Sequence, residues 1–324
     1  MLRTAICDLL DIEHPIFCAP MGFVTGAELA AAVSEAGGFG ILQAGLRTPD
    51  ALRAEIQRIR GATRKPFGVN FIQHFPHQAG VDVCLEERVA AVSFFWGDPR
   101  PFVERAHAAG VRVIDQVGSV ADARRDADAG VDIVIAQGVE GGGHIAGMIS
   151  TLALVPRVVD AIAPRPVAAA GAISDSRGIV AVLALGAQAA VLGTRFLASA
   201  ESDAHPEYKQ RIVAARESDT IRTTLFGRDW PDAPHRVLRT PFVERGDVSG
   251  STPVGMLHLG PGPIPILPGA PVPPSRATSG DIASMPLYAG QGAGLVNQVE
   301  PVAEIMRKLV AGAEQIVARM ALEA

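Results

Sequence analysis

The sequence predicts a closed (β/α)8 barrel, and two observations support this prediction. Short apolar runs alternate along the chain with alanine-rich segments of helical period, and eight such pairs can be counted. The apolar runs are continuous, as is typical of parallel strands buried on both faces. An open doubly wound sheet is the alternative, but no dinucleotide-type glycine fingerprint opens the first unit.

The predicted strands are four to seven residues long, and the loops that follow them would share one rim of the barrel. In chain order they are Ile16–Ala19, Phe39–Leu42, Phe67–Phe71, Ala90–Phe95, Val111–Val117, Ile133–Ala136, Val167–Ala170 and Ala189–Leu192.

Helices are expected between these strands, and several have end signals. Thr25 with Glu28, and Ser119 with Asp122, have the spacing of capping boxes. The predicted helices are Ala27–Ala36, Pro49–Ile59, a short one near Glu86–Arg88, Pro99–Ala109, Val120–Ala129, Leu152–Ile162, Ser176–Leu185 and Val299–Met320.

One segment, residues 217–285, interrupts the alternation because it is rich in proline and glycine. We expect neither regular helix nor central strand there. Since it lies between the eighth strand and the last helix, it would cover the rim as a lid, a subunit contact or a plain exposed loop. The whole chain, residues 1–324, is otherwise predicted to be a single barrel domain.

Composition limits the function classes. The 29 basic and 34 acidic residues give a net charge of −5 without basic clusters, so nucleic acid is not an expected partner. Cys7, Cys18 and Cys84 lack metal-ligand or redox-motif spacing, which predicts no metal site and a reducing compartment. With no signal peptide and no uninterrupted apolar span, we expect a cytoplasmic protein that does not enter a membrane.

The loop Gln137–His144 follows the sixth strand and contains three consecutive glycines. Glycines let the backbone approach a flat or charged ligand closely. His144 is the first side chain after them that could act on such a ligand, and we expect it to be functional.

The loops after the seventh and eighth strands are candidates for a phosphate site. In (β/α)8 barrels these loops commonly present backbone N–H groups to an anion. The alternative is that their glycines only make tight turns. The candidate residues are Gly171, Ala172, Gly193 and Thr194.

Together these motifs resemble the flavin-dependent barrels of the nitronate monooxygenase type, formerly called 2-nitropropane dioxygenases, which include flavin-dependent enoyl-ACP reductases. The resemblance covers nearly the whole chain in the family's order. It is carried by Ala19-Pro20-Met21-Gly22, Ala36-Gly37-Gly38-Phe39-Gly40, Phe67-Gly68-Val69-Asn70, Glu140-Gly141-Gly142-Gly143-His144, Gly193-Thr194-Arg195-Phe196, Glu201-Ser202-Asp203-Ala204-His205-Pro206 and Ala289-Gly290-Gln291.

The resemblance implies FMN bound at the rim. It assigns Met21 and Gly22 to the isoalloxazine, Asn70 and Gln116 to its polar edge, Gly142 and Gly143 to its flanks, Gly171, Ala172, Gly193 and Thr194 to the phosphate, and Gln291 to the cofactor site. The chain departs from the family at Ala172, where a second glycine is usual; this costs little if the φ angle of Ala172 stays negative. It departs again after His144, where two residues rather than one precede the next glycine.

The resemblance also implies a reaction, in which a small-molecule nitronate is oxidised by O2 to a carbonyl compound and nitrite. His144 would bind or deprotonate the substrate, since imidazole titrates near neutral pH. Two alternatives stay open. One is an NAD(P)H-dependent reductase of enoyl thioesters or quinones, and the other is a non-catalytic FMN- or phosphate-binding barrel.

The substrate pocket is predicted to draw on Phe23, His74, Phe95, Tyr288 and the 217–285 segment. His77 could also line it. A homodimer is left open. Four further histidines have structural interpretations, whereas His258 lies in the 217–285 segment and is left unassigned. These structural candidates are His14, His107, His205 and His235.

Overall fold

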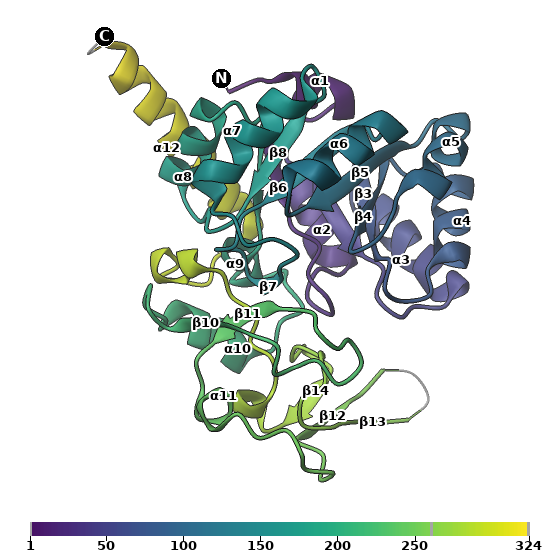
Figure 1. Ribbon diagram of the computed structural model, residues 1–324, viewed down its shortest axis with the longest axis vertical. Helices are drawn as coiled ribbons and strands as arrows, with labels where there is room; N and C mark the ends of the chain where they lie inside the picture. The colour runs from purple at the N-terminus through teal and green to yellow at the C-terminus, as the bar shows by residue number, and fades with distance from the viewer. Residues whose placement is uncertain (1, 260–261, 323–324) are drawn as a thin grey trace.

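The computed structural model describes residues 2–259 and 262–322 and shows a closed barrel (Figure 1). Eight parallel strands of the described chain form one sheet in the order β1-β9-β8-β6-β5-β4-β3-β2, and a bridge between Phe17 and Phe39 joins its edges. The predicted (β/α)8 barrel is confirmed. Its strands are β1 (Ile16–Cys18), β2 (Gly40–Gln43), β3 (Phe67–Ile72), β4 (Ala91–Phe95), β5 (Arg112–Val117), β6 (Ile133–Gln137), β8 (Val167–Ala170) and β9 (Ala189–Leu192).

Every predicted strand is present, with ends displaced by one residue at most, because continuous apolar runs mark parallel strands clearly. The surrounding helices are α2 (Ala27–Glu35), α3 (Pro49–Ala62), α4 (Gln78–Glu86), α5 (Arg100–Ala108), α6 (Val120–Ala129), α7 (Thr151–Ile162), α8 (Ser176–Ala184) and α12 (Val302–Leu322).

Two helix predictions were wrong. The short helix placed near Glu86–Arg88 is α4, which ends at Glu86; it has no side-chain cap and contains Gly80, so its start has no clear sequence signal. The cap of α2 is Gly26 rather than Thr25, because the Thr25 hydroxyl donates to the Ala19 carbonyl at 3.0 Å instead. The Ser119 cap of α6 is confirmed, since its Oγ accepts from the Asp122 N–H at 3.1 Å.

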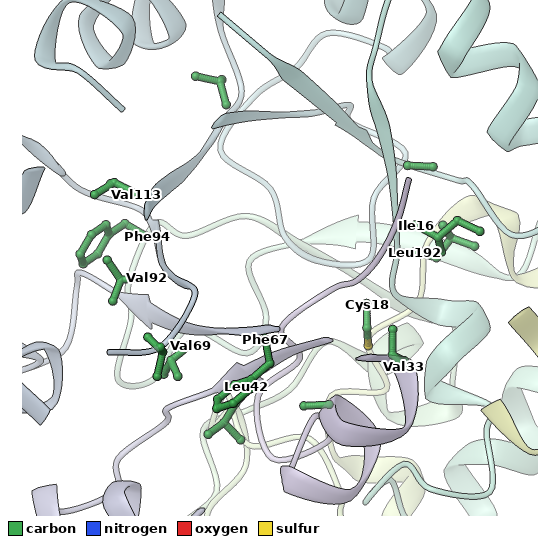
Figure 2. Close-up of a cluster of buried hydrophobic side chains, with 14 of the residues drawn as sticks. Ile16, Cys18, Val33, Leu42, Phe67, Val69, Val92, Phe94, Val113 and Leu192 are labelled. Atoms are coloured by element: carbon green, nitrogen blue, oxygen red, sulfur yellow. The ribbon is translucent and has the colours of Figure 1, made fainter. Parts of the chain in front are cut away.

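Alternate residues of each strand build two apolar layers. Inward residues such as Phe17, Ile41 and Ile114 fill the barrel, and helix α1 (Ala5–Leu10), which was not predicted, packs Ile6 and Leu10 against them. Outward residues pack against the helices, and Figure 2 shows part of this layer. The barrel interior is therefore a packed core, which leaves the rim for ligands.

The 217–285 segment forms a lobe on the side of the barrel where β7 (Gly143–His144) and α9 (Thr194–Leu197) lie (Figure 1). Neither regular helix nor central strand was expected there, but the segment contains the short helix α11, and β11 is the central strand of the β10-β11-β7 sheet. Residues 260 and 261 lie outside the described residues. The elements are β10 (Thr220–Thr223), β11 (His235–Leu238), α11 (Pro241–Arg245), β12 (Gly255–Leu257), β13 (Ile264–Ile266), β14 (Thr278–Gly280) and the 3-10 helix η1 (Ile282–Ser284).

Two more short elements flank the rim and were not predicted, namely α10 (Pro206–Val213) and the 3-10 helix η2 (Gln291–Leu295). Cys7, Cys18 and Cys84 are buried free thiols. No helix within residues 2–259 and 262–322 has the length and apolar character needed to span a bilayer.

Candidate active site

A pocket of about 330 Å³ lies at the carboxyl ends of the barrel strands. It brings together most of the residues that the sequence singled out. Those that line it are Met21, Gly22, Phe23, Asn70, Phe95, Gln116, Gly142, Gly143, His144, Gly171, Ala172, Gly193, Thr194 and Tyr288.

Two predicted site residues, Gln291 and His74, do not line the pocket, and both are exposed. Gln291 begins η2, and its backbone N–H donates to the Glu140 carbonyl at 3.0 Å, so only its main chain supports the glycine loop. His74 stacks on Trp230, a residue that was not predicted to belong to the site. The neighbouring His77 does line the pocket, as expected.

A polar layer closes the bottom of the pocket. It consists of Gln43, Asn70, Ser93, Gln116 and Gln137, which occupy inward positions of β2 to β6. The Asn70 amide donates to the Ser93 carbonyl and hydroxyl at 3.2 Å each.

Two acceptors of this layer, the Oε1 atoms of Gln43 and Gln137, are buried without a hydrogen-bond partner among the described residues. A buried polar atom left unpaired costs about 1–3 kcal/mol. Such atoms favour a polar ligand in contact with the layer. Neither glutamine was predicted as a site residue, although the period-2 alternation of β2 and β6 places both inward.

The loops after β8 and β9 present free backbone donors. The N–H groups of Gly171, Ala172 and Gly193 donate to no residue within 2–259 or 262–322. Gly171 has a φ of +125°, and a Cβ there would lie 2.3 Å from the Thr151 hydroxyl, so only glycine fits. Three unpaired N–H groups at the rim are what an anion such as phosphate requires.

Ala172 has a φ of +52°, so the condition under which an alanine would cost little at this position is not met. The alanine therefore occupies the left-handed region at a cost of about 1–2 kcal/mol. The surrounding loop holds it there without the glycine that is usual in this position.

The two glycines directly before His144 serve different purposes. A Cβ on Gly142 would lie 2.6 Å from the backbone nitrogen of Gly290, so this glycine permits close packing of two chain segments. Gly143 has a φ of +72° and open space around its missing Cβ. Gly22, on the loop after β1, also faces open space. A flat ligand could approach the backbone at Gly22 and Gly143.

The glycine loop is anchored at both ends. The Glu140 carboxylate accepts hydrogen bonds from the backbone N–H and the hydroxyl of Thr151, at 2.9 Å each, at the start of α7. β7 pairs with β11, so His144 lies opposite His235. These contacts fix the backbone that carries His144.

The His144 side chain lies in an aromatic enclosure. Its imidazole stacks on Trp230 with ring centroids 3.9 Å apart, and Tyr288 and Trp96 lie 5.5 Å and 6.1 Å away. Its Nε2 is buried without a partner among the described residues. Burial lowers the pKa of His144 to about 3, helped by His235 and His74. At neutral pH the imidazole is uncharged and can accept a proton or donate one hydrogen bond.

Other histidines have the structural roles that were expected. His235 is fully buried; its Nδ1 lies 2.9 Å from the Ala233 carbonyl, and its Nε2 accepts from the Phe226 N–H at 3.2 Å. Burial lowers the pKa of His235 to about 4. His205 caps α10, and His107 contacts Asp132 at 2.9 Å.

The mouth of the pocket is lined by residues that the sequence did not reveal. The 217–285 segment contributes Asp229, Trp230 and the run 271–273, and the barrel adds Leu46 and Phe75. These residues lie in irregular loops, where no period marks a side chain as inward-facing. Aromatic and proline side chains make the mouth predominantly apolar.

Comparisons with known proteins agree with this geometry. A profile of the family described as nitronate monooxygenase matches residues 3–80 and 73–312. A (3aS,4S,5R,7aS)-5-hydroxy-7a-methyl-1-oxo-octahydro-1H-indene-4-carboxyl-CoA dehydrogenase of Mycobacterium tuberculosis is 41% identical over 248 residues, covering 75% of this chain and 68% of that relative. A nitronate monooxygenase of Pseudomonas aeruginosa is 34% identical over 359 residues, covering 93% of this chain and 97% of that relative.

Solved structures show the same fold. FabK from Thermotoga maritima superposes with a TM-score of 0.85 at 37% identity, covering 100% of both chains. A nitroalkane oxidase from Streptomyces ansochromogenes superposes with a TM-score of 0.82 at 33% identity, covering 98% of this chain and 100% of that one.

Proposed function

The chain belongs to the nitronate monooxygenase family and is an oxidoreductase; from this premise we propose that it binds FMN in the rim pocket and oxidises nitronates with O2. The family relationship favours an enzyme over the non-catalytic barrel considered above. The proposal rests on how the pocket matches the cofactor and on the state of His144.

The pocket residues fit FMN in three respects. The unpaired amide oxygens of Gln43 and Gln137, beside Asn70 and Gln116, can meet the polar edge of an isoalloxazine. Open space at Gly22 and Gly143 allows a flat ring to lie against the backbone. The free N–H groups of the two phosphate loops suit the other end of the cofactor. When bound, FMN would supply an acceptor for the substrate's electrons and a route for them to O2.

The observation that carries the proposal is the His144 Nε2, which is buried, unpaired among the described residues and on an uncharged ring. With a pKa of about 3 the imidazole is too weak a base to take the α-proton of a nitroalkane, but it can donate its N–H to a nitronate oxygen. The apolar enclosure excludes water from this contact, which strengthens the hydrogen bond. His144 would thus bind and orient the substrate on the wall of the pocket.

The test is nitronate-dependent O2 uptake and nitrite release by the wild type and by His144→Ala. We expect the variant to keep visible flavin absorption while turnover falls about 10²- to 10³-fold, as is usual when a hydrogen-bond donor to a charged substrate oxygen is lost. His258→Ala is the matched control, because His258 is exposed and its ring contacts the Ser279 hydroxyl, outside the pocket. Unchanged turnover in His144→Ala would remove the assignment of His144.

A second candidate is an NAD(P)H-dependent reductase acting on acyl thioesters, which the apolar mouth at Leu46 and Phe75 favours. The match to FabK over both full chains and the thioester in the name of the M. tuberculosis relative support the same alternative. NAD(P)H consumption that depends on an enoyl thioester, without nitrite release from nitronates, would replace the first proposal with this one.

A further inference from the structure

Trp230 is a residue of the 217–285 segment that lines the pocket at the barrel rim. It is 2% exposed, although it lies in an irregular loop between β10 and β11. Its indole is stacked between two imidazoles, with His74 at 5.2 Å and an interplanar angle of 7° on one side and His144 at 3.9 Å and 23° on the other. Trp96 and Phe75 meet it edge-on at 5.0 Å and 5.5 Å.

Four rings from the rim of the barrel thus form a socket around one indole. Trp96, on the loop after β4, has a φ of +66°, which a bulky residue rarely adopts. Backbone strain of this kind persists only where the surroundings enforce it, and it is concentrated at functional sites.

The loop that carries Trp230 is held by hydrogen bonds that do not involve its indole. The Arg228 N–H donates to the Gly269 carbonyl at 3.1 Å, and the Ile145 N–H donates to the Pro234 carbonyl at 2.8 Å. The His74 ring contacts the Asp229 carbonyl at 3.2 Å. These contacts hold the loop independently of the indole, so the indole can be truncated without releasing the loop.

We propose that Trp230 is a positioning residue for His144: its indole holds the imidazole plane in one orientation and keeps water from that face, so that His144 meets the substrate uncharged. The proposal rests on the role proposed above for His144. The other titratable groups that face this imidazole are His235 on β11, His74 on the loop after β3, and Tyr288. None of the three stacks face to face on His144, so the indole is the group whose removal opens the ring to solvent.

The experiment measures the titration of His144 by NMR of ring-labelled histidine in the flavin-loaded protein, between pH 4.5 and about 8. The signal is assigned by its loss in His144→Gln. In the wild type we expect no titration of His144 above about pH 5. In Trp230→Ala we expect His144 to titrate with a midpoint close to the ordinary value of about 6.5. In Trp230→Phe, which keeps a stacked ring, we expect the midpoint to return towards that of the wild type.

Turnover is measured in parallel. We expect kcat of Trp230→Ala to fall about 10- to 100-fold, as displacement of a catalytic group does, and its pH profile to gain an acidic limb near pH 6.5. Phe242→Leu is the matched control, because Phe242 packs on Phe226 in the same segment but does not line the pocket. It should leave the His144 titration unchanged.

The proposal is overturned if His144 titrates normally in the wild type, if Trp230→Ala leaves both titration and kcat unchanged, or if Phe242→Leu reproduces its effects. The titration needs no substrate. If it behaves as expected while the wild type oxidises no nitronate, the proposed function fails and the positioning role of Trp230 stands.

Discussion

His144 occupies a site in which burial opposes its charge. Burial is the main cause that lowers the pKa of its imidazole to about 3, and the neighbouring His235 and His74 add to this effect. The sequence indicated His144 through the glycines before it. It could not indicate the enclosure, because Trp96, Trp230 and Tyr288 come from three distant loops.

The depressed pKa of His144 predicts how acid affects stability. Its folded pKa of about 3 lies below the unfolded value of about 6.5, so the unfolded state binds the extra proton as pH falls from 7 to 5 and stability is lost over this window. The loss from this one group should be about 2 kcal/mol.

Denaturant unfolding of the wild type and His144→Gln at pH 7 and pH 5 checks this prediction. His144→Gln should lose less stability between the two pH values, by about that amount. Burial raises the pKa values of the carboxyls Asp115 and Asp126, so these groups favour the folded state as the pH falls. Because both carboxyls are present in the wild type and in His144→Gln, they do not affect the comparison. Equal losses in the two proteins would contradict the shielding of His144.

At the scale of elements, the positions of the loops after the strands could be predicted from the sequence, but their backbone conformations could not. The apolar runs of β6 and β8 predicted two parallel strands. Because parallel strands end on the same rim of a barrel, the glycine loop and Gly171 were correctly expected to lie on one rim. The positive φ of Ala172 could not be predicted, since a single alanine carries no signal of a left-handed conformation. Helix α4 was predicted at the wrong residues because no capping side chain marks its start. Helix α6, which Ser119 caps, was predicted at its observed bounds.

The neighbouring residues Gly171 and Ala172 offer a matched pair of substitutions. Gly171→Ala should destabilise the flavin-loaded protein by about 3 kcal/mol and weaken flavin retention, because it combines a φ of +125° with a contact of 2.3 Å. Ala172→Gly should change stability by less than about 1 kcal/mol, since relief of its strain is offset by the freer unfolded chain.

Thermal unfolding with flavin fluorescence measures both variants. If Gly171→Ala keeps the stability and the flavin of the wild type, the loop after β8 is not the rigid phosphate site proposed here.

At the scale of the whole molecule, the barrel and most of its rim follow from patterns of period 2 and 3.6, whereas the lobe of residues 217–285 does not. Its role as a lid or a subunit contact remains a proposal, supported by Asp229, Trp230 and residues 271–273 in the pocket wall. Proline-rich loops are fixed by tertiary contacts such as the Trp230 socket. The residues of the 217–285 segment that line the pocket therefore help to select the substrate, and the conformation of this segment is the part of the fold that the sequence predicts least well.

The most direct test of the central claim is anaerobic mixing of the purified, flavin-loaded protein with an alkyl nitronate or propionate-3-nitronate, and separately with NADH or NADPH. The account predicts that the nitronate alone bleaches the flavin absorption and that His144→Ala bleaches far more slowly. No bleaching by any nitronate, together with rapid bleaching by NADH or NADPH, would contradict it and identify a reductase.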